Sequence, residues 1–127
     1  MKHGPHLFEY AVVRVVPRVE REEFINVGVV LLCRPQNFLA MQVHLDEARL
    51  SLYPALDRAV LDAHIRSFQQ VCEGGPGSGP IGQLTTAERF RWLTASRSTL
   101  LQTSPVHPGL CDNAADMIQH LMAQLVA

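Results

Sequence analysis

Tyr10–Cys33 reads YAVVRVVPRVEREEFINVGVVLLC, and this stretch decides the fold class of the chain. It holds two apolar runs rich in β-branched residues, which are separated by a short and densely charged connection. Runs of this composition that end at a proline or a polar cluster are typical of β-strands. Because their apolar character is nearly continuous, we expect strands at Leu7–Val16 and Ile25–Cys33 that are buried on both faces.

A third strand is predicted directly after this pair. Arg34–Asn37 has the composition of a turn, and the following Phe38–Leu45 alternates apolar and polar side chains. Two strands joined by a short turn make a hairpin, so we expect an antiparallel meander with Ile25–Cys33 as its middle strand. One face of the third strand should point to the core, through Leu39, Met41, Val43 and Leu45.

The rest of the chain is mostly helical in pattern, with apolar residues at helical spacing. We expect a helix at Ala55–Glu73, then a Gly/Pro loop at 74–84, then a helix from the capping box Thr85–Glu88 to about Ser96. A short strand at Thr99–Thr103 and a stiff turn at Pro105–Pro108 should follow. The last helix should begin after Asp112, which is its predicted N-cap. These elements predict a single α+β domain over residues 1–127. Its antiparallel sheet of three to four strands, an N-terminal meander, should pack against two to three helices.

The composition of the chain excludes several classes of protein. With 47 % hydrophobic and 18 % charged residues among 127, it has the composition of a globular domain. A formal net charge of −1 gives no overall attraction to nucleic acid or to a membrane surface, so we expect neither partner.

The three cysteines are far apart and form no Cys-x-x-Cys motif, so we expect no disulfide framework and no structural zinc site. Cys33 and Cys72 fall in apolar segments and should be buried free thiols. The histidines form no metal-binding motif and no signal-peptide pattern is seen, so we expect no metal, no cofactor and a cytoplasmic location.

Arg14 interrupts the first apolar strand, and a buried guanidinium needs a carboxylate, backbone carbonyls or a bound anion. Two explanations fit the sequence. In one, Arg14 forms a salt bridge with Glu23 or Glu9 in a charged turn. In the other, Arg14 joins Arg18 and Arg21 in a patch that recognises an anion or a partner.

Asn26 and Gly28 interrupt the second strand in the same way. Strand alternation places both on one face, and a glycine there often marks a bulge or the close approach of a backbone, a side chain or a ligand. Packing beneath a helix explains the glycine structurally. A polar floor, on which Asn26 binds a ligand or partner that lies over Gly28, explains it functionally.

A second polar region, Arg97–Gly109, is stiffened by two prolines. Arg97, Gln102 and His107 are its candidates for ligand or partner binding. A histidine on such a loop serves as a turn cap or as an acid or base, so His107 and Glu23 are the candidates for catalysis. No nucleophile motif accompanies them.

The chain resembles an uncharacterised bacterial family, domain of unknown function 3037. The resemblance rests on Val13–Pro17, Glu23–Val30, Arg89–Trp92 and Arg97–Asp112. It implies no activity, substrate or cofactor, but it implies a partner, because members are encoded beside a protein similar to HipA-type serine/threonine kinases. The signature positions of the family would fall on Arg14, Pro17, Glu23, Asn26, Gly28, Arg97, Gln102, His107 and Asp112.

Three functions are consistent with these observations. The first is a non-enzymatic accessory or binding module of a bacterial two-gene system, which partners the HipA-like kinase-type protein or holds a small anionic or nucleotide-like ligand. The second is an enzyme of unrecognised type that acts on such a ligand, and it requires His107, Glu23 and an arginine within hydrogen-bond reach of one another. The third is a structural domain that forms a homo-oligomer.

Overall fold

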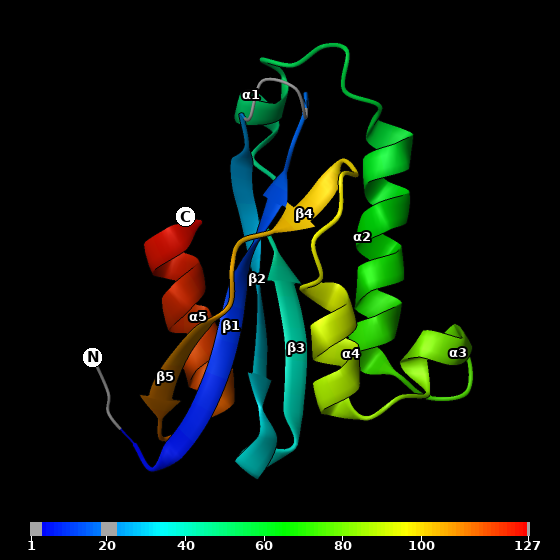
Figure 1. Cartoon of the computed structure of the whole chain (residues 1–127). Helices are drawn as coiled ribbons and strands as arrows, with labels where there is room; N and C mark the ends of the chain where they lie inside the picture. The colour runs from blue at the N-terminus through cyan, green and yellow to red at the C-terminus, as the bar shows by residue number, and fades with distance from the viewer. Residues whose placement is uncertain (1–3, 19–22, 127) are drawn as a thin grey trace.

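The computed structural model describes residues 4–18 and 23–126 of the chain. Figure 1 shows a central sheet with helices on both of its sides. In chain order the elements are β1 (His6–Val15), β2 (Ile25–Cys33), the 3-10 turn η2 (Arg34–Gln36), β3 (Phe38–Val43), α1 (Glu47–Leu50), α2 (Arg58–Glu73), α3 (Gly79–Gly82), α4 (Thr86–Leu93), β4 (Leu101–Thr103), β5 (His107–Cys111) and α5 (Ala114–Leu125). The predicted α+β domain is confirmed, with one strand more than the three to four expected.

The strands form one antiparallel sheet in the order β3-β2-β1-β4, and β5 pairs with the other half of β1. The N-terminal meander and the middle position of β2 within it are therefore confirmed. Along β1, β4 pairs with Val13–Val15 and β5 pairs with His6–Tyr10. Between these two stretches Ser104 bonds Val12 twice, since its amide donates to the Val12 carbonyl and its hydroxyl accepts from the Val12 amide, both at 2.8 Å.

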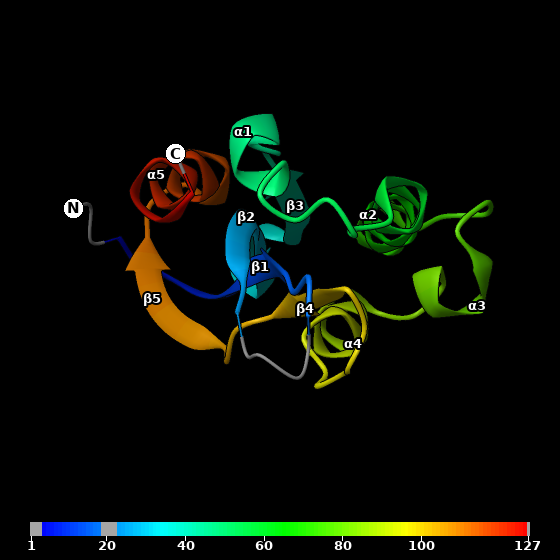
Figure 2. The same cartoon turned by 90° about the horizontal axis from the view of Figure 1, so that it is seen from above.

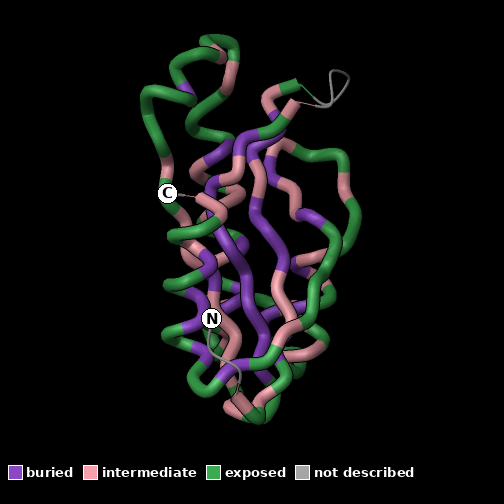
Figure 3. The backbone as a smooth tube through the Cα atoms, turned by 90° about the vertical axis from the view of Figure 1, so that its left-hand side faces the viewer, coloured by how far each residue is buried: buried purple, intermediate pink, exposed green. Residues whose placement is uncertain are grey.

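Both faces of the sheet are covered, as the continuous apolar character of the first two strands predicts. Figure 2 shows α2 and α4 on one side of the sheet and α5 on the other. We call these sides the α2/α4 face, which buries Ala11, Val13, Val15, Leu61 and Phe90 among others, and the α5 face, which buries Phe8, Val29, Leu31, Cys111 and Ile118 among others. Figure 3 shows that the buried positions concentrate along the central strands.

A β-bulge in β2 changes which residues share a face. Val13 of β1 is paired with Gly28, but the next residue, Arg14, is paired with Asn26, so Val27 is the extra residue. Gly28 and Asn26 therefore oppose successive residues of β1 and lie toward opposite faces of the sheet. The expectation that they share one face is wrong, because strict alternation leaves out the inserted residue.

The predicted helices begin where side chains cap them. α2 starts at Arg58 rather than Ala55, because Asp57 is its N-cap and accepts a hydrogen bond from a first-turn amide at 3.2 Å. The predicted capping box of α4 is confirmed, with Thr85 and Glu88 bonding each other's backbone amides.

Two expectations for the last third of the chain are wrong. The residue that caps α5 is Asn113 and not Asp112, since the Asn113 side chain accepts a hydrogen bond from the amide three residues on at 3.0 Å. The second half of the stiff turn expected at Pro105–Pro108 is not a turn but the start of a strand, His107–Cys111. Pairing with β1 produces this strand in spite of its proline and glycine, which have low strand propensity.

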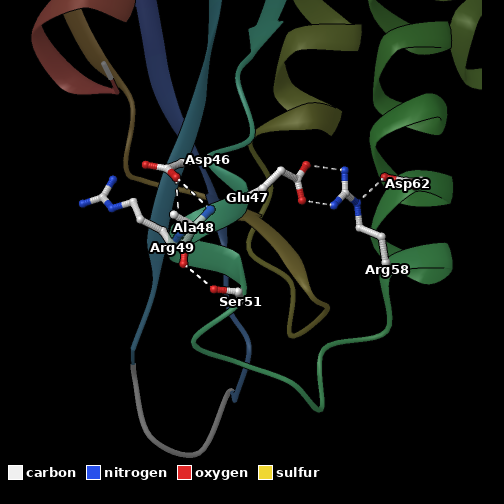
Figure 4. A network of polar contacts seen from close by, with 7 residues as sticks. All are labelled: Asp46, Glu47, Ala48, Arg49, Ser51, Arg58 and Asp62. Carbon is white, nitrogen blue, oxygen red and sulfur yellow. Dashed lines mark hydrogen bonds and ion pairs between the residues drawn. The ribbon is translucent and has the colours of Figure 1, made fainter.

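A short helix, α1, lies between the third predicted strand and the helix predicted from Ala55, where no element is predicted from the sequence. Arg58 at the start of α2 holds it in place, because the guanidinium donates to both carboxylate oxygens of Glu47 at 2.5 and 2.9 Å and to Asp62 at 3.0 Å (Figure 4). The hydrogen bond from Arg58 lowers the pKa of Glu47 below its usual value. Within the described residues, no helix has the length and apolar character that crossing a membrane requires.

Candidate functional site

Three of the predicted site residues form one row across the sheet. Arg14 in β1 is paired with Asn26 in β2 on one side and with Gln102 in β4 on the other. Paired residues of an antiparallel sheet point to the same face, so all three side chains lie toward the α5 face. The strand order, rather than nearness in the sequence, makes them neighbours.

Arg14 is half-buried, and its guanidinium makes no hydrogen bond or ion pair within the described residues. Its guanidinium carbon lies 4.0 Å from the centre of the Phe24 ring, which is a cation–π contact. The predicted salt bridge to Glu23 or Glu9 is therefore wrong. Glu9 points to the opposite face of β1, and an aromatic ring rather than a carboxylate covers the guanidinium.

Asn26 ties this row to the end of α5. Its Nδ2 atom donates to the Leu125 carbonyl at 3.3 Å. Its Oδ1 atom and the Nε atom of Arg14 are both buried, and neither has a hydrogen-bond partner among the described residues. Leaving a buried polar group unsatisfied costs about 1–3 kcal/mol, so such groups are few in folded proteins and each needs an explanation. Gln102 does not bond either of these two atoms. Its side-chain amide nitrogen donates instead to the Thr99 carbonyl at 2.8 Å.

A hollow of about 440 Å³ opens beside the row, between the start of β2, α1 and the end of α5. Its walls are Phe24, Ile25, Asn26, Asp46, Arg49, Gln124, Leu125 and Val126. The Phe24 side chain is 49 % exposed, so the ring that stacks on Arg14 is also accessible from the hollow. A molecule in the hollow would meet an aromatic ring with a cation behind it.

Arg49 gives the hollow a cation of its own. Figure 4 shows its side chain pointing away from the pair formed by Glu47 and Arg58, and its guanidinium has no hydrogen bond or ion pair in the part of the chain that is described. The nearby Asp46 carboxylate is already engaged, because one of its oxygens accepts from the backbone amides of Ala48 and Arg49 at 3.1 and 3.2 Å. The walls of the hollow therefore carry one guanidinium, that of Arg49, and one carboxylate that already accepts backbone hydrogen bonds.

Gly28 has no part in this site. A Cβ atom at this position would lie 2.2 Å from the Gln42 carbonyl oxygen, so the glycine lets the backbone of β3 approach. Of the explanations that the sequence left open, close approach of a neighbouring backbone is the one observed.

Arg97 is turned into the domain. Its two terminal nitrogens donate to the carbonyls of Leu93 and Trp92 at 3.0 and 2.5 Å, and its guanidinium packs against the rings of Phe68 and Trp92. Burial lowers its pKa from the usual value. These contacts cap the end of α4, so the donors of Arg97 are used inside the fold.

His107 lies away from the row. It is exposed on β5 and paired with Tyr10, and the two rings are 5.4 Å apart. Tyr10 and Arg14 are four residues apart on β1, which separates them by about 13 Å at the rise of a strand.

Glu23 and Arg18 lie at the other end of β1. Both line a separate hollow of about 370 Å³ beside Leu52 and Tyr53. His107 and Glu23 therefore do not converge, because one lies beside the first half of β1 and the other near its end. Arg21, the third arginine of the predicted patch, lies outside the described residues.

Sequence reasoning missed two members of the site, Phe24 and Arg49. Phe24 is an aromatic residue between a charged run and an apolar strand, a place where exposure is unusual, and this signal could have drawn attention to it. Nothing in the sequence marks Arg49, because only the folding of α1 beside the start of β2 brings it to the hollow.

The chemistry of the site suits an anionic group. A guanidinium offers paired N–H donors that match a carboxylate or phosphate, and such charge-assisted bonds are stronger than neutral ones. Among the described residues, no three His, Cys, Asp or Glu side chains gather in a way that could hold a metal ion. The arrangement therefore provides groups that can bind an anion.

Comparison with known proteins adds a family but no activity. The family model described as "Protein of unknown function (DUF3037)" matches residues 10–126, nearly the whole chain. Among curated proteins and among solved structures, nothing matches this sequence.

Proposed function

The chain belongs to the DUF3037 family, and we propose that it is a non-enzymatic binding module of a bacterial two-gene system. In this proposal the row of Arg14, Asn26 and Gln102, with the hollow beside it, holds an acidic segment of a partner protein. The partner is the HipA-like kinase-type protein that the family resemblance implies.

The unpaired guanidinium of Arg14 carries this proposal. A half-buried cation loses hydration on folding, and a nearby carboxylate usually compensates for that loss. No side chain of the described residues supplies one, although Glu9 and Glu23 lie nearby in the sequence. A carboxylate from a partner would complete the site.

The surroundings of Arg14 favour an extended segment over an isolated ion. Asn26 and Gln102 flank the guanidinium. Their amide nitrogens donate inside the fold, so in this proposal their amide oxygens accept from the backbone N–H groups of a bound chain. The exposed ring of Phe24 offers apolar contact beside the charge, and Arg49 can bind a second acidic residue in the hollow.

The test is a titration of the ¹⁵N-labelled protein with hexaglutamate peptide and, separately, with inorganic phosphate. We expect the peptide to shift the amide signals of Arg14, Phe24 and Asn26 and the guanidinium signal of Arg14. Arg14→Gln should weaken peptide binding about tenfold or more, since a charge-assisted hydrogen bond is worth about 1.5–3 kcal/mol. Arg49→Gln, which alters only an exposed side chain, should weaken it less.

Arg66→Gln is the matched control, because Arg66 is exposed on α2 and makes no polar side-chain contact among the described residues. It removes the same charge and should bind like the unmodified protein. Equal affinity for Arg14→Gln and Arg66→Gln would overturn the proposal. Tighter binding of phosphate than of the peptide would shift the assignment to a small anionic ligand.

The enzyme alternative receives no support from the geometry. It requires His107, Glu23 and an arginine to meet, and these side chains lie along different parts of β1. Proton transfer needs donor and acceptor within hydrogen-bond reach, which is about 3 Å.

A further inference from the structure

We propose that the outer face of the ribbon formed by β1 and β5 is a dimerisation surface, which packs against the same face of a second copy of this chain. The inference is independent of the anion site, since the two lie toward opposite faces of the sheet. It rests on an apolar strip without a covering helix and on charges of both signs beside it.

The strip consists of Leu7, Val106, Pro108 and Leu110. Leu110 and Pro108 are paired with Leu7 and Glu9 of β1, so these side chains share the α2/α4 face, and Val106 continues the alternation. Leu7 is 56 % exposed, Leu110 46 % and Val106 39 %. A strand with apolar side chains toward solvent at successive alternate positions marks an interaction site.

Much of the other face of the same ribbon is packed against α5, although His107 is exposed there. Phe8 is buried and lies over Gly109, where a Cβ atom would come within 2.5 Å of the ring, and Cys111 is buried under α5. Figure 2 shows α5 on this side of β5, and among the described residues it shows no helix on the other side. The strip is thus the uncovered half of a two-sided element.

A shallow hollow of about 150 Å³ borders the strip and contains Glu9, Arg34 and Arg91. Although they line one hollow, none of the three forms an ion pair within the described residues. The rim therefore carries one carboxylate and two guanidinium groups that form no close ion pair within the described residues. Arg91 is nevertheless near enough to Glu88 that its charge, after the hydrogen bonds from Thr85, lowers the pKa of that carboxyl.

A second copy fits this combination better than a partner of one charge sign. Two identical faces related by a two-fold axis bring each residue opposite a different residue of the other copy. Glu9 of one copy can then meet Arg34 or Arg91 of the other, while the two apolar strips cover each other. The strip is short for a stable interface, so we expect dimerisation to depend on concentration.

Sedimentation velocity over micromolar to near-millimolar concentration tests the proposal with the full chain. We expect the unmodified protein to pass from monomer to dimer and Leu110→Glu to stay monomeric. Leu52→Glu is the matched control, because Leu52 lies outside the strip and is 75 % exposed. This variant should dimerise like the unmodified protein. Glu9→Arg should weaken the dimer, and adding Arg91→Glu should restore it.

A monomer at every concentration would overturn the proposal, and so would a dimer that Leu110→Glu leaves intact. If Leu110→Glu does not fold, as judged by circular dichroism, Val106→Lys replaces it in the same sedimentation experiment, because Val106 lies in the strip but outside the strand. Loss of dimerisation in Leu52→Glu would place the interface elsewhere on the molecule. Failure of the peptide titration would leave this result unaffected.

Discussion

Gly28 shows at the scale of one residue how closely two strands meet. The Cβ of an alanine here would collide with a backbone carbonyl oxygen, which cannot turn aside as a side chain can. We therefore expect Gly28→Ala to lower the free energy of unfolding by about 3 kcal/mol or more, because β2 and β3 must separate to admit the methyl group. Urea denaturation measures this directly.

Gly77→Ala provides the control for that substitution. A Cβ at Gly77 would meet no atom within 4 Å, and its backbone does not require glycine. Its free energy of unfolding should stay within about 1 kcal/mol of the unmodified protein, with a small gain from the stiffer unfolded chain. Equal losses in the two variants would show that the contact of Gly28 with β3 is not what constrains it.

At this scale the sequence predicts which residues are unusual but not what they contact. Arg14, Asn26 and Gly28 all stand out, because each is a poor choice for an apolar strand. The bulge at Val27 then separates Asn26 from Gly28, and a single inserted residue leaves no periodic signal to detect. Arg97 could not be assigned from sequence either, since its partners are carbonyls of α4.

At the scale of one element, the side chain of Arg89 caps the C-terminal end of α2. Its guanidinium donates to the carbonyls of Val71 and Cys72 at 2.8 Å each and to the Leu84 carbonyl at 3.1 Å. It therefore caps the end of α2 from α4 and fixes the loop between them. We expect Arg89→Ala to lower the free energy of unfolding by about 2–3 kcal/mol, because buried carbonyls lose a charged donor.

A control substitution that removes the same charge at an exposed site shows whether the loss of stability comes from the lost cap or from the lost charge. Arg66→Ala removes a guanidinium that makes no polar contact among the described residues, so its midpoint in urea should stay near that of the unmodified protein. Should both variants lose equal stability, overall charge rather than the cap of α2 would be responsible.

Most elements could be predicted because each carries a local signal. β1, β2 and β3 have apolar runs ended by turns, and α4 has its capping box. β5 could not be predicted, because Pro108 and Gly109 argue against a strand and only pairing with β1 makes it one. The candidate site depends on that same long-range pairing, so its residues could be named but not assembled.

For the whole molecule, the thiol of Cys72 links stability to pH. Burial raises its pKa to about 12 from an ordinary value of 9.0. The folded state therefore keeps a proton that the unfolded chain loses above pH 9. By linkage its contribution to stability is complete below that pH and is lost progressively as the pH rises toward 12.

Urea denaturation at several pH values between 8 and 11 tests this with Cys72→Ala as the reference. Stability of the unmodified protein should fall more steeply than that of the variant, whose remaining groups titrate alike. Parallel curves would mean that the thiol ionises equally in both states. Maleimide should correspondingly label Cys72 only through unfolding, because the reactive species is the thiolate.

The position of β1 has a consequence for how the protein is made. β1 precedes the other strands of this sheet in the chain, so β2 and β3 can pair with it as soon as they are synthesised. The other edge of β1 stays unpaired until β4 and β5 have been synthesised. The α5 face of the sheet stays uncovered until α5 has followed them. Until α5 is synthesised, the nascent sheet therefore exposes an apolar face and an open edge, the kind of surface that chaperones bind and that aggregates form on.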